Sequence, residues 1–165
     1  MMPFQELYNC YFKRIYAYIL LRVKDPVLAE DLCAATWRKA YEKINSFEEE
    51  KGTFGQWVFT IARNEVNMHR RLYWVKNIFS ITETEDLLTS GDKPILQEME
   101  ENEFKKHLFE ALDKLSARER DLISLKFYSG LNNRQIAGVT GLSQSNVGTI
   151  LSRALHKMKQ QMEIL

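Results

Sequence analysis

The chain has 165 residues, of which 45% are hydrophobic and 27% are charged. These proportions are typical of a soluble globular protein and exclude a disordered one. The longest apolar or aromatic run, residues 15–21, is too short to cross a bilayer, so we expect no membrane insertion. Met1 is followed by an amphipathic helical pattern and not by a charged-then-apolar leader, so we expect no secretory signal. The cysteines Cys10 and Cys33 show no metal-binding spacing, which favours a reduced, cytoplasmic protein.

Charge is unevenly distributed, although the formal net charge at pH 7 is only +1. Basic residues outnumber acidic ones by 11 to 9 in residues 1–75 and by 10 to 5 in residues 105–165, whereas acidic residues predominate by 8 to 2 in residues 76–104. Phosphate neutralisation supplies most of the non-specific affinity for DNA. We therefore expect this near-neutral chain to bind DNA weakly by itself.

Apolar residues recur at helical spacing through the N-terminal part of the chain. They predict a first helix from Phe4 to about Arg22 and a second that begins at Asp25-Pro26, with Asp25 as its cap, and runs to about Ile44. Five residues of this second helix are expected to be buried: Leu32, Thr36, Trp37, Ala40 and Tyr41.

A polar loop, residues 45–53, separates the second helix from a third. Thr53 and Gln56 form a predicted capping box at the start of that helix. Its apolar residues are interpreted as core. Its basic end, residues 69–71, is either a solvated helix end or, beside the aromatic residues that follow, a surface for unstacked bases and phosphates.

The helical period is lost between residues 80 and 94, where Thr, Ser, Glu, Asp, Gly and Pro dominate. It returns from about Gln97, and Ser116 with Glu119 forms a second predicted capping box. The pattern predicts an all-α fold of two small helical domains joined by a flexible linker. The expected bounds are 1–75 and 105–165 for the domains and 76–104 for the acidic linker.

The most informative stretch is residues 131–162, which has the pattern of a helix-turn-helix. Asn132 caps a short helix, Gly141 provides the turn, and Ser143 caps a longer helix with an apolar stripe that ends in Leu155 and Met158. The opposite face combines short hydrogen-bonding side chains with cations, as reading a major groove requires. An ordinary helical hairpin is the alternative. Eight residues are the candidate DNA contacts: Arg134, Ser143, Gln144, Ser145, Asn146, Thr149, Arg153 and Lys157.

Two sets of motifs resemble those of bacterial RNA polymerase sigma factors. The first comprises Ala-Glu-Asp-Leu at 29–32, Thr-Trp at 36–37, Phe-Gly-Gln-Trp at 54–57 and Ile-Ala-Arg-Asn at 61–64. The second comprises Leu-Asp-Lys-Leu-Ser at 112–116, Arg-Glu-Arg at 118–120, Gly-Leu at 130–131, Gln-Ile-Ala at 135–137 and Arg-Ala at 153–154. Their order, with only a short linker between them, resembles the small extracytoplasmic-function class.

The resemblance implies that the second helix binds the clamp of the polymerase largest subunit and that the flap of the second subunit holds the C-terminal domain. The implied clamp contacts are Glu30, Asp31, Ala34, Ala35 and Arg38. It also implies that the C-terminal domain recognises an upstream promoter element, while the N-terminal domain recognises and opens a downstream one. The implied downstream contacts are Asn45, Ser46, Thr53, Arg63, Asn64, His69, Arg70 and Arg71.

Opening a promoter requires that a base be unstacked and held in a pocket. We hypothesise that loop 45–53 captures a base of the displaced strand, and its three consecutive glutamates argue for base rather than phosphate contact. Some positions depart from the family pattern and leave the promoter sequence open: Ala34, Ala35, Met68, Gly148 and Ile150.

The sequence contains no motif that is typical of a catalytic site. The three histidines, His69, His107 and His156, lie in separate predicted helices, and neither a glycine-rich phosphate loop nor a Cys/His cluster occurs. We expect no enzymatic activity, cofactor or metal. The expected partners are core RNA polymerase and promoter DNA, with an anti-sigma factor as a further candidate. The alternative is a stand-alone helix-turn-helix regulator with an N-terminal sensing or dimerisation domain.

Overall fold

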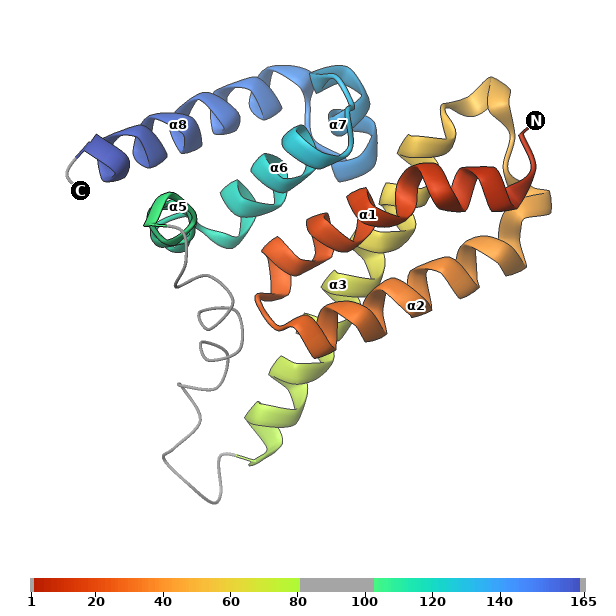
Figure 1. The fold of residues 1–165 in the computed structure, drawn as a ribbon, viewed down its shortest axis with the longest axis horizontal. Coiled ribbons are helices and arrows are strands. Elements are labelled where there is room, and N and C mark those ends of the chain that lie inside the picture. The colour runs from red at the N-terminus through yellow and green to blue at the C-terminus, as the bar shows by residue number, and fades with distance from the viewer. Residues whose placement is uncertain (1, 81–102, 164–165) are drawn as a thin grey trace.

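A computed structural model describes residues 2–80 and 103–163, and every regular element in these two ranges is helical. This agrees with the predicted all-α fold (Figure 1). The N-terminal domain contains α1 (Phe4–Val23), α2 (Pro26–Lys43), the short 3-10 helices η1 (Ile44–Ser46) and η2 (Glu49–Lys51), and α3 (Phe54–Ser80). The C-terminal domain contains α5 (Glu103–Asp113), α6 (Ala117–Tyr128), α7 (Asn133–Thr140) and α8 (Gln144–Glu163).

Side-chain caps fix where the helices begin. Oδ1 of Asp25 accepts hydrogen bonds from the backbone N–H groups of Val27 (3.0 Å) and Leu28 (3.2 Å), and Pro26 occupies the first helical position. At the start of α3, the Thr53 N–H donates to Oε1 of Gln56 (3.1 Å), and the Gln56 N–H donates to the Thr53 hydroxyl (3.3 Å). These bonds satisfy N–H groups that a helix cannot pair internally, as predicted from the sequence.

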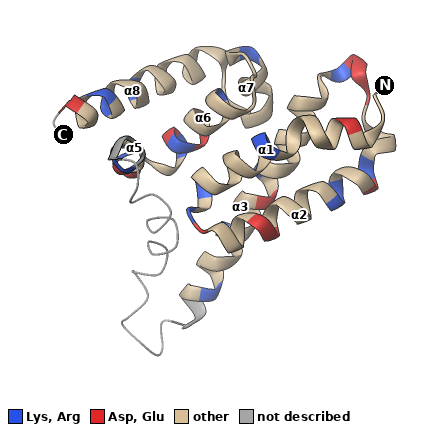
Figure 2. Cartoon of the chain, in the orientation of Figure 1, with Lys and Arg blue, Asp and Glu red and all other residues tan. Residues whose placement is uncertain are grey.

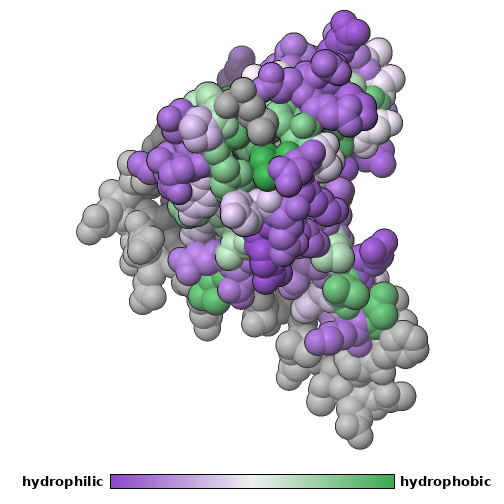
Figure 3. Space-filling model, turned by 90° about the vertical axis from the view of Figure 1, so that its right-hand side faces the viewer, coloured by the Kyte–Doolittle hydropathy of each residue, from purple (hydrophilic) through white to green (hydrophobic). Residues whose placement is uncertain are grey.

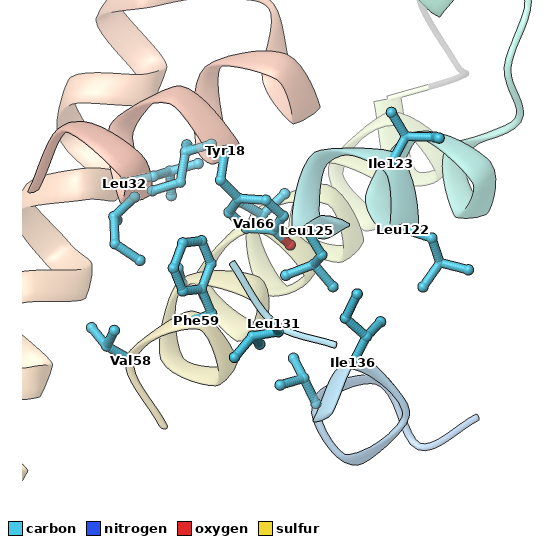
Figure 4. Close-up of a cluster of buried hydrophobic side chains, with 14 of the residues drawn as sticks. Tyr18, Leu32, Val58, Phe59, Val66, Leu122, Ile123, Leu125, Leu131 and Ile136 are labelled. Carbon is cyan, nitrogen blue, oxygen red and sulfur yellow. The ribbon is translucent and has the colours of Figure 1, made fainter. Parts of the chain in front are cut away.

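The two domains pack against each other: α1 lies against α6, and α3 lies against α7. Their buried apolar side chains form one continuous cluster, in which Tyr18 and Phe59 of the N-terminal domain lie near Leu125 and Leu131 of the C-terminal domain (Figure 4). Burial of this apolar surface favours the packed arrangement. The sequence predicted the two domains but not this interface.

Two apolar residues are more exposed than their helical patterns predicted. Tyr41 was expected to be buried, yet 66% of it is accessible; its ring packs edge-on against Phe4, with 5.3 Å between centroids, while its neighbour Ala40 points into the core. Leu155 is 46% exposed beside the fully buried Ala154. In both cases the buried stripe of the helix is narrower than the run of apolar residues.

The third helix continues past residue 75 to Ser80, and its last turns project away from the body of the molecule (Figure 1). The predicted linker sequence at 81–94 and the expected helix start at Gln97 lie outside the described residues. Among the helices that the structure describes, none is long and apolar enough to cross a membrane.

Candidate nucleic-acid interface

The helix-turn-helix is built from local hydrogen bonds that the sequence predicted. The Asn132 side chain accepts from the Gln135 N–H (2.9 Å), and the Gln135 side chain accepts from the Asn132 N–H (3.0 Å). Gly141 has φ +75° and donates its N–H to the Ala137 carbonyl (2.9 Å), which closes α7 in a conformation that favours glycine. The Ser143 hydroxyl accepts from the backbone N–H of residue 146 (3.1 Å) and starts α8.

The second helix of this motif has a buried stripe and an exposed polar face. Val147, Leu151, Ala154 and Met158 are buried against the rest of the domain. All eight candidate upstream contacts are solvent-exposed: Arg134, Ser143, Gln144, Ser145, Asn146, Thr149, Arg153 and Lys157. The polar face is therefore free to enter a major groove without rearrangement of the domain.

One cation of this face also has a structural partner. Lys157 donates to Oε1 of Glu119 (2.7 Å), while Oε2 of Glu119 accepts from the Ser116 N–H (2.8 Å) in the predicted capping box. Burial alone would raise the pKa of Glu119, but these hydrogen bonds outweigh burial and hold its pKa below the usual range. Lys157 thus ties α8 to the start of α6.

The predicted base-capture loop borders a pocket of about 270 Å³. Its wall includes the aromatic side chains of Phe47 and Trp57, whose ring centroids are 5.4 Å apart, together with the polar groups of Ser46 and Thr53. Asn45 is exposed on the same loop but does not line the pocket. Glu48 also lines the pocket, and the acidic part of the loop is the red ribbon at the upper right of Figure 2. Aromatic surface beside hydrogen-bonding groups is what an unstacked base requires.

The remaining downstream candidates lie along α3 and differ in accessibility. Asn64, Arg70 and Arg71 are exposed, and His69 is half-buried. The side chain of Arg63 instead contacts the C-terminal domain, where its Nε donates to Oδ2 of Asp121 (2.8 Å).

The projecting end of α3 combines cations with aromatic side chains. His69 and Arg70 share an open pocket with Tyr73 and Trp74, which are 48% and 67% exposed. Figure 3 shows this end as a protrusion with both apolar and hydrophilic surface. It is a second place where aromatic groups and positive charge meet.

The five implied clamp contacts lie on one accessible side of α2. Ala35 is half-exposed, and the other four are exposed: Glu30, Asp31, Ala34 and Arg38. None of the five lines the pocket beside loop 45–53 or the pocket at the end of α3.

A buried polar cluster that the sequence patterns did not predict lies between the domains. The Asp121 carboxylate, with a side chain only 6% exposed, accepts from the Tyr18 hydroxyl (2.8 Å), from Arg22 (2.6 Å) and from Arg63. Burial holds the pKa of the Tyr18 hydroxyl above its ordinary value, although Arg22 opposes this effect. The available signal was Arg22 itself, because a cation on an apolar stripe needs a buried partner.

Comparison with known proteins identifies the fold and its class. The family model for Sigma-70 region 2 matches residues 7–75, and that for Sigma-70 region 4 matches residues 111–160. The chain is 28% identical to the ECF RNA polymerase sigma factor SigM of Bacillus subtilis over 159 residues, covering 96% of this chain and 94% of SigM. It is 30% identical to the RNA polymerase sigma factor YlaC of the same organism over 161 residues, covering 96% of this chain and 91% of YlaC.

Solved structures share the arrangement of the helices. The sigma factor RpoE in complex with the anti-sigma factor NepR from Bartonella quintana superposes with a TM-score of 0.77 at 23% identity, covering 98% of this chain and 97% of that one. CnrH in complex with the cytosolic domain of CnrY gives a TM-score of 0.70 at 19% identity, covering 98% and 88%. At these identities the likeness concerns the fold.

The fold and the two sets of motifs together define a transcription initiation factor with one domain for each sigma-70 region. The chain belongs to the sigma-70 family of bacterial RNA polymerase sigma factors, in its extracytoplasmic-function class. It binds core RNA polymerase and directs the enzyme to promoter DNA for transcription initiation. Within the described residues, no group of His, Cys, Asp and Glu side chains is arranged to hold a metal ion.

Proposed function

We propose that the two domains divide promoter recognition between them, with α8 reading an upstream duplex element and the N-terminal domain opening a downstream one. The observation that carries this division is the contrast between their surfaces. The exposed face of α8 is a straight row of short polar groups and cations. The N-terminal domain offers instead the aromatic and polar groups of a pocket, whose wall α7 completes. A duplex groove suits the first, and an unstacked base suits the second.

In the upstream element, the N-terminal turn of α8 approaches the base edges. Gln144, Ser145, Asn146 and Thr149 provide amide and hydroxyl groups for this purpose. The cations Arg134, Arg153 and Lys157 lie where they reach phosphates, which fix the register of the helix on the duplex.

In the downstream element, a base of the displaced strand enters the pocket between loop 45–53 and α3. Unstacking a base costs a few kcal/mol. Stacking on Trp57 recovers about 1–3 kcal/mol of this cost, and hydrogen bonds to Ser46 and Thr53 contribute to the remainder. Asn64, Arg70 and Arg71 follow along the same helix and are exposed for the backbone of that strand.

The protein partners follow from the family. The exposed side of α2 meets the polymerase clamp, and the flap of the second subunit holds the C-terminal domain. One structural relative, the sigma factor RpoE, is bound to the anti-sigma factor NepR in its solved complex, which supports such a partner here. The protein acts in the cytoplasm, where its polymerase is, and by binding alone, without catalysing a reaction.

Run-off transcription from a pool of genomic promoters, with core RNA polymerase in the presence and absence of the protein, tests this function. We expect new start sites that depend on the protein and share two spaced upstream elements. No new starts, together with a shift of duplex DNA by the protein alone at moderate salt, would favour the stand-alone regulator instead.

A further inference from the structure

We propose that a second pocket beside loop 45–53, between this loop and α1, holds the base next to the one held beside Trp57. The inference rests on the proposed function, because it extends the capture of one unstacked base to two neighbouring bases of the same strand. Three features support it: a wall that the second pocket shares with the first, a chain of aromatic rings that joins the two pockets, and a carboxylate in the lining of the second.

The two pockets share a wall that the loop provides. Phe47, Gly52 and Thr53 line both of them. The other walls differ, because Trp57 belongs to the first pocket and Tyr11 of α1 belongs to the second. The second pocket has a volume of about 530 Å³, which is in the range of ligand-binding pockets, and its lining residues all lie within positions 2–54. A strand that places one base beside Trp57 therefore meets a further cavity at the same loop.

Aromatic rings continue from the first pocket into the second. The ring centroid of Phe54 lies 5.5 Å from that of Trp57 and 5.4 Å from that of Tyr11. Phe47, which lines both pockets, has its centroid 5.4 Å from that of Trp57 and 5.6 Å from that of Phe54. Each distance is between one and two steps of stacked DNA, which are about 3.4 Å each. Walls this close suit neighbouring nucleotides, and aromatic walls recover stacking that the bases lose when the duplex opens.

The Tyr11 wall is held in place by its neighbours. A Cβ on Gly55 would lie 3.2 Å from the Tyr11 hydroxyl oxygen, so the glycine lets this ring pack directly on the start of α3. Cζ of Arg14 lies 4.8 Å from the centroid of the same ring, and Nε of Arg14 donates to the Tyr128 carbonyl (2.8 Å). Arg14 also lines the second pocket. The pocket thus combines a fixed aromatic wall with a cation, the two groups that hold single-stranded nucleic acid.

A carboxylate indicates which bases the second pocket accepts. Glu49 is exposed and lines the second pocket, whereas Glu48 lines the first and is paired with Lys51 (2.7 Å). An ionised carboxylate only accepts hydrogen bonds, so it favours a base with an exocyclic amino group and disfavours thymine, which presents O4 as an acceptor instead. The second base is therefore adenine, cytosine or guanine.

The first test removes single bases and single aromatic walls. Core RNA polymerase that carries the protein is titrated onto a pre-opened promoter from the run-off assay, with one abasic nucleotide at each position of the displaced strand in turn. Fluorescence anisotropy gives the Kd. With the unmodified chain, abasic sites at two neighbouring positions should each weaken binding at least about fivefold, as the loss of one stacked base implies. Trp57→Leu should abolish the effect at one of these positions, and Tyr11→Leu should abolish it at the other.

Phe12→Leu is the matched control, because Phe12 is the next residue of α1 and is exposed without lining either pocket. It should retain both effects. A Tyr11→Leu protein that is folded by circular dichroism and retains both effects would overturn the proposal, as would loss of the same position in the Trp57 and Tyr11 variants. A single sensitive position with the unmodified chain would contradict the second pocket alone. If the proposed base capture itself is wrong, no abasic position weakens binding.

The second test leaves the aromatic walls intact and alters an exposed side chain. The second position is the sensitive one that Trp57→Leu leaves unchanged, and it is set in turn to each of the four bases. The unmodified chain should bind the thymine template at least about fivefold more weakly than the best of the others. Glu49→Gln should remove most of this preference, because an amide both donates and accepts.

Glu50→Gln is the matched control for this test, since Glu50 is an exposed neighbour that lines neither pocket. It should discriminate against thymine as the unmodified chain does. Equal discrimination by the Glu49→Gln and Glu50→Gln proteins would contradict the assignment of Glu49 to the second base.

Discussion

The two candidate DNA surfaces differ in how much of each is engaged by the protein itself. On α8, every candidate contact is exposed, and among those residues Lys157 has an ion-pair partner, Glu119, within its own domain. On the downstream surface, Arg63 is bound by Asp121 and the loop pocket shares a wall with α7. The candidate contacts on α8 are accessible as they stand, whereas the downstream surface shares residues with the interface between the domains.

The largest expected effect is on strand opening through the pocket. Trp57→Leu keeps an apolar side chain in the wall but removes the stacking plane, so we expect open-complex formation to fall about 5- to 150-fold, as the loss of about 1–3 kcal/mol of stacking implies. Permanganate footprinting of unpaired thymines measures the opening. Phe12→Leu, an exposed aromatic of α1 outside all candidate surfaces, is the control. An undiminished footprint would remove Trp57 from the base pocket.

The upstream surface is tested by Asn146→Ala. Loss of a side chain that contacts a base edge costs about 1–3 kcal/mol, so we expect about tenfold weaker promoter use in a run-off titration. Gln160→Ala, exposed near the other end of α8, is the matched control. Because Asn146 and Trp57 lie in different domains, their effects should add in the double variant. Strong non-additivity would mean that the two surfaces do not act independently.

Two glycines of the helix-turn-helix separate backbone strain from helix propensity. Gly141 has φ +75° and open space around its Cβ position, so Gly141→Ala should lower the free energy of unfolding by about 1–2 kcal/mol through strain alone. Gly148 lies inside α8 with 3.7 Å between its Cβ position and Asn133, so Gly148→Ala should raise it by about 0.5–1 kcal/mol. Urea unfolding measures both, and equal signs would contradict this account.

The smallest effect concerns the pH dependence that Glu119 gives the C-terminal domain. Its pKa is held below the ordinary value in the folded state, so its stabilising contribution is present above the ordinary carboxyl pKa and is lost as pH falls through the folded-state pKa. We compare the free energy of unfolding of the unmodified chain and Glu119→Gln between about pH 6 and about pH 3. The free energy of unfolding of the variant should fall less steeply as the pH is lowered. If both proteins show the same slope against pH, the capping box is not the source of the pH dependence.

The family and the helical architecture were predictable because their signals are local. Each capping bond joins residues three apart, as in Thr53 with Gln56 or Asn132 with Gln135, and the αL turn at Gly141 needs only one residue of special freedom. The exposed face of α8 follows from helical periodicity in the same way. Exposure of Tyr41 and Leu155 was not predictable, because the width of a buried stripe depends on the neighbouring helices.

The sequence by itself therefore determined the helices, their caps, the helix-turn-helix and membership of the sigma-70 family. Only the tertiary structure decided which cations are free for DNA. Arg63 and Asp121 are 58 positions apart, and Tyr18 and Asp121 are 103 apart, so no local pattern connects them. Their pairing arises because the apolar faces of α1, α3, α6 and α7 are buried together, which leaves the charged groups at that interface with one another as partners.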